Sequence, residues 1–162
     1  MDAVHSFAPL FHKQCTVLIL GTAPSPRSLQ TQQAYGHPRN HFWRLMTLVL
    51  GEEYQEDYGK RREMLLRHNI ALWDVCFSCQ RKGALDKDIT DVIPNDIPAL
   101  LNSSNISLIA FNGTKAQQLF KKHFPQITTQ TLLLPSSSPV PRKGMVTLED
   151  KLPRWQALQA YL

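Results

Sequence analysis

Four short, mostly apolar runs limit what this chain can fold into more than any other feature. They cover residues 16–20, 70–75, 106–111 and 131–134. Such runs, bounded by turn residues, are typical of strands buried on both faces of a parallel sheet. Helix-like spacing of apolar residues is found over residues 41–50, 55–68, 96–101, 114–123 and 148–162. Alternating strands and helices predict an α/β protein whose parallel sheet is covered on both faces.

The ends of two predicted helices carry local signals. Gly51 follows the apolar face of residues 41–50 and is placed to end that helix. Thr147 and Asp150 have the spacing of a capping box at the start of the last helix. Pro153 lies close to that start and lacks a backbone donor, so a local irregularity is expected there.

The segments that follow the predicted strands are polar and rich in Gly, Pro and Ser. They are residues 21–25, 74–76, 112–114 and 135–139. In open α/β sheets, ligands bind beyond the carboxyl ends of the strands, so these segments should converge on one ligand-binding edge. The first of them continues into a long connection that ends near residue 40. Connections of this length in compact domains are usually functional or disordered, and the aromatic content here argues against disorder.

The overall totals exclude some classes of protein. A length of 162 residues fits one domain, 1–162, with a substantial core. No apolar run approaches the roughly 18 residues of a membrane span, and the first residues lack a signal-peptide pattern. Three cysteines, Cys15, Cys76 and Cys79, favour reduced thiols in the cytoplasm. A net charge of +5 permits a polyanionic partner without requiring one.

Four blocks of sequence, in order, resemble the uracil-DNA glycosylase superfamily. They are GTAP at 21–24 with HPRNHFW at 37–43, ALWDVC at 71–76 with RKGALD at 81–86, FNGTKA at 111–116, and LPSSSP at 134–139. The branch that they most resemble is the sixth family, the hypoxanthine (deoxyinosine) DNA glycosylases. The mismatch-specific uracil glycosylases share a His-Pro-x-Asn-x-Phe-Trp block with it.

This resemblance implies a fold and a reaction. The fold is a three-layer α/β/α arrangement around a four-stranded parallel sheet, which agrees with the four apolar runs. The reaction is monofunctional hydrolysis of the N-glycosidic bond of a deaminated base in double-stranded DNA, as in base excision repair. Hypoxanthine is the first expected base and uracil the second. We expect no cofactor, no metal and no membrane partner, and a monomeric enzyme.

Two residues are the expected catalytic groups. Asn40 is the catalytic residue that the resemblance implies, and an amide can hold and orient a water at the anomeric carbon. Its position also suits an N-cap of the helix over 41–50, and both roles can hold. Asp74 ends the second predicted strand, where a carboxylate could accept from a purine N–H or stabilise developing positive charge. The alternative is a turn or capping aspartate.

The expected base-binding residues are Gly21, Thr22, Ala23, Tyr35 and Asn112. Ala23 stands where the mismatch-specific branches have a water-positioning asparagine, which shifts that task to Asn40. Tyr35 matches the aromatic on which a flipped base stacks; the alternative is a core tyrosine. Asn112 precedes a helix start whose backbone N–H groups could hold a phosphate, or it belongs to an ordinary turn.

The expected DNA-binding residues are Ser136, Ser137, Ser138, Val140 and Arg142. In the superfamily, the loop after the last strand presses on the phosphates beside the lesion and fills the gap that the flipped base leaves. Serine hydroxyls and backbone N–H groups suit phosphates. Val140 is the expected wedge, with Pro139 a close second, and a plain surface loop is the alternative.

Expectations for five further residues complete the sequence analysis. Leu134 replaces a polar residue of other branches. Phe42 and Trp43 are expected in the core, and Asp86 and Asp88 in a solvated loop.

Two other classes of function stay open. A DNA-binding module that recognises damage without cleavage is suggested by Ala23 and by Ser25, which replaces the glycine usual after the proline. Base release under single turnover separates it from an enzyme. A thiol redox protein is suggested by the C-x-x-C at Cys76 and Cys79, although no Gly-Pro step flanks it. Structural zinc and iron–sulfur sites usually need four ligands, which three cysteines do not supply.

Overall fold

A computed structural model describes residues 2–162 and contains the expected parallel sheet. Its strands are β2 (Val17–Gly21), β3 (Ile70–Asp74), β6 (Leu108–Asn112) and β7 (Gln130–Leu134). They are all parallel and lie in the order β3-β2-β6-β7. The four apolar runs therefore predicted the sheet, with ends shifted by one or two residues.

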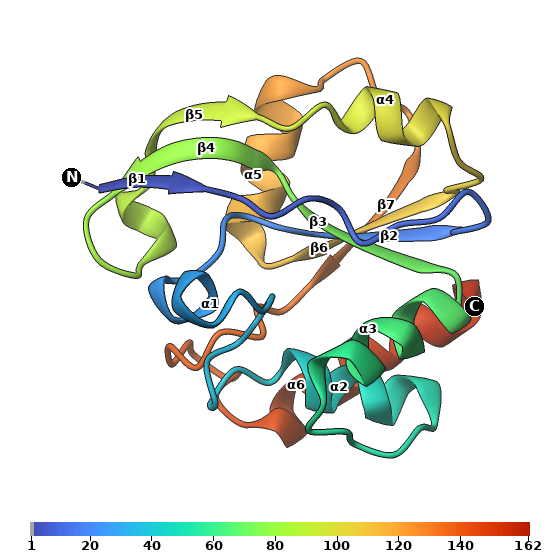
Figure 1. Ribbon diagram of the computed structural model, residues 1–162. Helices are drawn as coiled ribbons and strands as arrows, with labels where there is room; N and C mark the ends of the chain where they lie inside the picture. The colour runs from blue at the N-terminus through green and yellow to red at the C-terminus, as the bar shows by residue number, and fades with distance from the viewer. Residues whose placement is uncertain (1) are drawn as a thin grey trace.

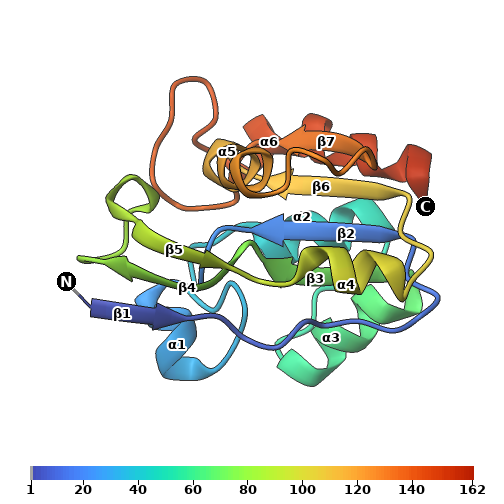
Figure 2. The same ribbon diagram turned by 90° about the horizontal axis from the view of Figure 1, so that it is seen from above.

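Helices cover both faces of this sheet, as Figures 1 and 2 show. On one face lie α2 (Phe42–Leu50), α3 (Tyr58–Arg67) and α6 (Leu148–Trp155). On the other lie α4 (Ile97–Asn102) and α5 (Thr114–His123). The three-layer α/β/α architecture is confirmed.

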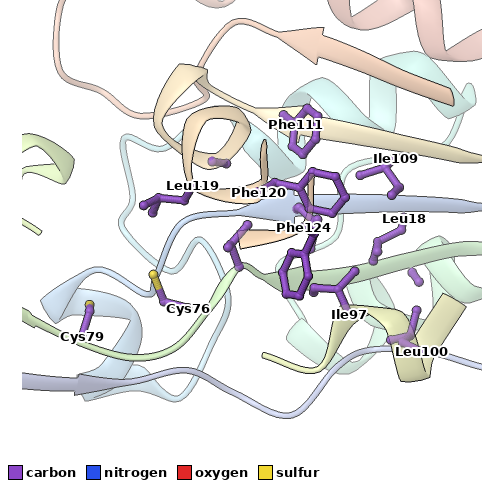
Figure 3. Packing of buried hydrophobic residues seen from close by; sticks show 14 of the residues in the cluster. Leu18, Cys76, Cys79, Ile97, Leu100, Ile109, Phe111, Leu119, Phe120 and Phe124 are labelled. Carbon is purple, nitrogen blue, oxygen red and sulfur yellow. The ribbon is translucent and has the colours of Figure 1, made fainter. Parts of the chain in front are cut away.

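Alternate residues of each strand supply the two halves of the core. In β2, Leu18 and Leu20 belong to the half beneath α4 and α5, which Figure 3 shows, and Val17 and Ile19 belong to the half beneath α2, α3 and α6. Successive side chains of a strand point to opposite faces, so a strand covered twice must be apolar at every position. This is why the runs read as continuous rather than alternating.

The predicted helix ends are close to the observed ones. Gly51 adopts the left-handed conformation that ends α2, and its N–H donates to the Thr47 carbonyl. The capping box of Thr147 and Asp150 begins α6. The last helix was predicted to run to residue 162, but α6 ends at Trp155 and continues as the 3₁₀ helix η2 (Gln156–Tyr161). Pro153 lies inside α6, and the α-helix continues past it to Trp155.

A second sheet was not predicted. It is antiparallel and comprises β1 (Asp2–His5), β4 (Cys76–Arg81) and β5 (Thr90–Pro94) in the order β1-β4-β5. Its strands mix exposed and buried residues irregularly, and the register of β4 with β5 shifts twice, so no clear period-2 pattern reaches the sequence. Across residues 2–162, no helix combines the length and apolarity that crossing a membrane requires.

Candidate active site

A cavity of about 520 Å³ opens at the carboxyl ends of the parallel strands. The segments after β2, β3, β6 and β7 all reach it, as expected. Residues of the long connection between β2 and α2 line it as well, together with Arg81 and Asp86 from the part of the chain that follows β3. The connection contains a short helix, α1 (Pro26–Thr31), and Asp86 begins the 3₁₀ turn η1 (Asp86–Asp88).

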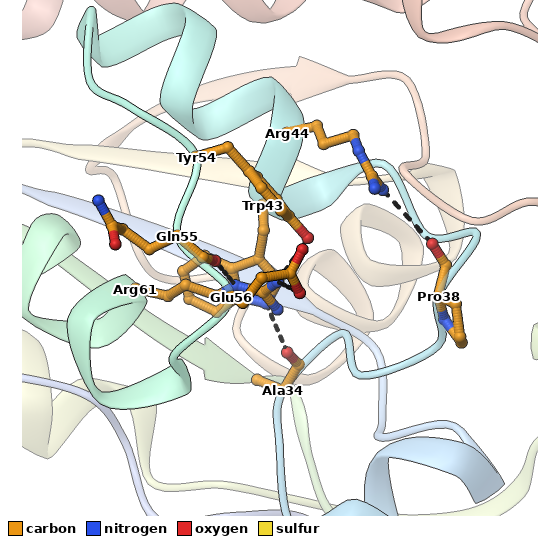
Figure 4. Close-up of polar contacts among 8 residues, drawn as sticks. All are labelled: Ala34, Pro38, Trp43, Arg44, Tyr54, Gln55, Glu56 and Arg61. Atoms are coloured by element: carbon orange, nitrogen blue, oxygen red, sulfur yellow. Dashed lines mark hydrogen bonds and ion pairs between the residues drawn. The ribbon is translucent and has the colours of Figure 1, made fainter.

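The connection from β2 to α2 is held in place by side chains rather than by a sheet. The Ser25 hydroxyl caps α1 by accepting from the Ser28 N–H, and the Ser28 hydroxyl accepts from the Gly36 N–H at 3.0 Å. Figure 4 shows two further ties, in which Trp43 Nε1 donates to the Ala34 carbonyl at 2.8 Å and Arg44 donates to the Pro38 carbonyl at 3.4 Å. The expected core residue Trp43 thus also fixes the loop.

Asn40 lines the cavity at the start of α2. The N-cap of α2 is His41, one residue later than the sequence predicted, and its side chain makes no capping bond, so the predicted N-cap role of Asn40 was wrong. The Asn40 Oδ1 instead accepts a hydrogen bond from the N–H of Phe42, the first residue of the helix, at 2.9 Å. This contact occupies the amide oxygen and fixes the side chain, while the amide nitrogen keeps its two donors.

Tyr35 lies flat against the core and lines the cavity. Its ring stacks on Phe42 with centroids 4.2 Å apart and 24° between the planes. Its backbone φ of 54° is the left-handed region, which is uncommon for an aromatic residue and typical of functional sites. Its buried hydroxyl makes no hydrogen bond of standard geometry among residues 2–162, although the Asn112 side chain is close enough to oppose the rise that burial causes in its pKa. One ring face rests on the core.

Gly21 brings Tyr35 and Asp74 together. A Cβ atom at this position would lie 2.6 Å from Asp74 Oδ1 and 2.6 Å from the Tyr35 hydroxyl oxygen. Real Cβ contacts essentially never reach that distance, so any other residue here would displace the Asp74 carboxyl and the Tyr35 hydroxyl. The carboxyl and the phenol are close neighbours because β2 ends without a side chain.

Two carboxyl groups share this part of the cavity, and the sequence led us to expect only one. Asp86 was expected in a solvated loop, but it lines the cavity and accepts a hydrogen bond from the Thr22 hydroxyl at 3.1 Å. Burial raises the pKa of Asp74 to about 7; the negative charge of Asp86 adds to the rise and Arg81 opposes it. Burial also raises the pKa of Asp86, and the hydrogen bond from Thr22 opposes this rise. The expectation for Asp86 was wrong, although the RKGALD block already contained it.

Asn112 is 7% exposed and its amide is already engaged. Its Nδ2 donates to the Ser137 hydroxyl and its Oδ1 accepts from the Ser137 N–H, each at 2.9 Å. Ser137 is only 1% exposed, so this residue anchors the loop after β7 to β6. Gly113, at φ 96°, lets that loop approach, since a Cβ there would lie 3.2 Å from Ser136 Cβ.

A buried lysine ties the same loop to α2 and α6. Lys151 is 1% exposed, and its Nζ contacts His41 Nδ1 and the Ser138 carbonyl, each at 3.0 Å. The His41 N–H donates to the Ser137 carbonyl. Burial lowers the pKa of Lys151. Lys151 was not among the predicted site residues, because its neighbours in α6 are charged as well.

The remaining expected site residues take several positions. Ala23 lines the cavity and packs against the core. Ser136, Ser138 and Val140 line it too, and Val140 is 39% exposed. Arg142 lies beyond the cavity on the exposed part of the loop.

The cysteines do not form a reactive pair. Cys76 and Cys79 are buried as free thiols on β4. Burial raises the pKa of both, which disfavours the thiolate that redox chemistry needs. In residues 2–162, no group of three or more His, Cys, Asp or Glu side chains is arranged to hold a metal ion.

Together these groups form a cavity in which an aromatic ring lies beside an amide and two carboxyl groups at the carboxyl ends of a parallel sheet. The profile of the uracil DNA glycosylase superfamily matches residues 8–159. This chain belongs to that superfamily and is a DNA glycosylase, which confirms the family expected from the four sequence blocks.

Three relatives match almost the whole chain. A hypoxanthine DNA glycosylase of Methanosarcina barkeri is 36% identical over 141 residues, which cover 86% of this chain and 89% of that protein. A hypoxanthine DNA glycosylase of Methanosarcina acetivorans is 35% identical over 154 residues, covering 94% and 95%. A solution NMR structure from Methanosarcina acetivorans, described as a candidate uracil DNA glycosylase, has a TM-score of 0.84 and 32% identity, covering 98% and 97%.

Proposed function

We propose that this chain acts as one monofunctional glycosylase domain that releases hypoxanthine from deoxyinosine in double-stranded DNA, with uracil as a second substrate. The observation that carries this proposal is the shared cavity of Asn40, Tyr35 and Asp74 at the carboxyl ends of the sheet. Two relatives named hypoxanthine DNA glycosylase, at 36% and 35% identity, support the choice of base.

Asn40 holds the attacking water in this proposal. The reaction passes through an oxocarbenium-like sugar, and the water must reach its anomeric carbon in a fixed orientation. The Oδ1 contact with the α2 backbone fixes the amide, and the Nδ2 donors remain for the water. Ala23 has a methyl group and cannot share this task.

Tyr35 receives the flipped base. A base taken out of the helix loses its stacking neighbours, and a flat aromatic surface replaces them. Gly21, Thr22 and Asn112 form the surrounding wall, with Asn112 acting through the loop that it anchors. Asp74 faces the same cavity and contacts the departing base.

The loop after β7 meets the DNA backbone. Ser136 and Ser138 offer hydroxyl protons to the phosphates beside the lesion, and the buried Ser137 keeps the loop in place. Val140, exposed beside the cavity, fills the gap in the duplex, and Arg142 contacts a phosphate. We further propose a monomer that works without metal or cofactor in the cytoplasm, where the three free thiols stay reduced.

Base release under single turnover tests this function. Excess enzyme is incubated with duplexes bearing deoxyinosine, uracil, xanthine or mismatched thymine, with and without chelator. We expect hypoxanthine release, an abasic product and no effect of chelator. A protein that binds the deoxyinosine duplex and releases no base from any duplex would instead be the damage-recognising module suggested by Ala23 and Ser25.

A further inference from the structure

The Asp74 carboxyl lies where a negative charge receives little support. Its neighbour at the end of β2 is the Tyr35 hydroxyl, which is itself buried and makes no hydrogen bond of standard geometry to Asp74 or to any other of residues 2–162. The Thr22 hydroxyl donates to Asp86 instead. The Arg81 side chain donates hydrogen bonds to the carbonyls of Pro24 and Gly83. Its positive charge therefore acts on Asp74 without a direct hydrogen bond.

We propose that Asp74 works as the general acid of the reaction, giving its proton to the departing purine, and that Asp86 is the positioning residue that keeps this proton on Asp74. The proposal rests on the function proposed above and assigns the carboxyl a role in it. It replaces the sequence-based idea of a carboxylate that stabilises positive charge. An anion at this place would stand beside a second carboxyl, which favours the protonated form.

The proton and electron balance of the step is simple. The C1′–N9 bond breaks and its electron pair goes to the base, while the Asp74 proton moves to N7 of the same base. Neutral hypoxanthine and an Asp74 carboxylate result. The water held by Asn40 forms the new bond to C1′ and loses one proton to solvent, and Asp74 takes one up from solvent before the next turnover.

Physical reasons favour a proton donor here. A catalytic acid is most effective when its pKa is near the working pH, and the pKa of Asp74 is raised to about 7 by burial and by Asp86. A raised carboxyl pKa in a cavity, set by burial and a second carboxyl, is the usual arrangement for such an acid. The other titratable or charged groups that face this cavity are Tyr35, His37, Arg39, Tyr58, Arg62, Arg81 and Asp86, and the charges of Lys115 and Arg142 act on Asp86 from outside it.

The test is the single-turnover excision rate on a deoxyinosine duplex between pH 5.5 and 9. The wild-type rate should fall about tenfold for each pH unit above roughly 7, as Asp74 ionises. Asp74→Asn keeps the shape and an N–H donor but has no proton to give. Its rate at pH 6 should be about 10²–10⁴-fold lower, and it should lack the alkaline fall.

Asp86→Asn separates positioning from a structural role. Removing the like charge lowers the pKa of Asp74, so the alkaline fall should begin at a lower pH. The rate at pH 8 should drop severalfold while the rate at pH 5.5 stays near that of the wild type. A variant that is merely damaged would be slower at both pH values. Asp88→Asn, on the same turn but outside the cavity, removes an equal charge and should leave the profile unchanged.

The outcomes are distinguishable. If the wild type releases no base at any pH, the proposed function fails. If it releases base at a rate that is flat or rises between pH 7 and 9, only the acid role of Asp74 is overturned. The acid role is also overturned if the alkaline fall disappears in His37→Gln, because the imidazole would then be the donor, or if Asp86→Asn and Asp88→Asn behave alike.

Discussion

Asp74→Asn should stabilise the protein, and the gain should grow with pH. The folded state raises the pKa of Asp74 from 3.8 to about 7. Below pH 3.8 the carboxyl is protonated in both states and the raised pKa costs nothing. Between the two values the folded state must keep or take up a proton that the unfolded state has released, so the free energy of unfolding falls as pH rises.

The size of the effect follows from the shift. Each pKa unit corresponds to about 1.36 kcal/mol, so the full cost above pH 7 is at most about 4 kcal/mol. At pH 5 about a third of this cost is present, and at pH 8 all of it. The advantage of Asp74→Asn should therefore be larger at pH 8 than at pH 5 by about 2–3 kcal/mol.

Urea unfolding of both proteins at pH 5 and pH 8 measures this difference. Asp88→Asn is the matched control, because it removes a carboxyl from the neighbouring turn outside the cavity. An equal change at both pH values would mean that the amide alters packing alone. A smaller advantage at pH 8 would mean that the Asp74 anion is stabilised in the folded state, and the reasoning about its burial would be refuted.

The remaining predictions concern the cavity and the loop after β7. Asn40→Asp keeps an oxygen that can accept from the Phe42 N–H, so it should melt like the wild type and cleave far more slowly, whereas Asn40→Ala should also lose about 1 kcal/mol of stability; thermal melts and excision rates check both. Gly21→Ala should cost about 1–3 kcal/mol in urea unfolding and abolish excision, because its Cβ would meet two oxygens at 2.6 Å. Lys151→Met should change stability by only about 1 kcal/mol, since the lost hydrogen bonds are offset by the charge no longer buried, yet speed proteolysis of the loop after β7. Val140→Gly should slow excision more from a stable base pair than from a mismatch, and equal slowing would remove the assignment of Val140 as the wedge. Arg142→Ala should lower the slope of DNA affinity against salt concentration by about one, and an unchanged slope would remove the phosphate contact.

The parallel sheet could be predicted because burial on both faces leaves a direct trace in the sequence. Every position of β2 is buried, so the apolar run and the strand nearly coincide. The second sheet leaves no such trace, because β5 is largely exposed and β4 pairs with it through two register shifts. The third strand, β1, pairs with β4, which is far from it in the sequence, and no local pattern encodes such a distant pairing.

The site was only partly predictable for the same reason. Asn40, Tyr35 and Asp74 follow strands or precede a helix at the expected edge, so topology alone gathers them. Asp86 reaches the cavity from the connection between β4 and β5, and a charged residue in a polar segment is predicted as solvated when those strands are unknown. Lys151 was missed for a different reason. Core residues are predicted from their apolar side chains, whereas Lys151 is a charged residue that is buried among uncharged acceptors.

Several unfavourable features of this fold lie at one end of the sheet. Tyr35 has a left-handed backbone and a buried hydroxyl without a hydrogen bond of standard geometry, Asp74 stands beside another carboxyl, and the Lys151 Nζ is buried against a ring nitrogen and a backbone carbonyl. Each lowers stability on its own, and a continuous apolar core on both faces of the sheet offsets them together. Strain gathered beside a cavity is the pattern expected where selection acts on a reaction as well as on the fold. The same cavity would be the place where stabilising substitutions cost activity, and Asp74→Asn is the first example that the structure predicts.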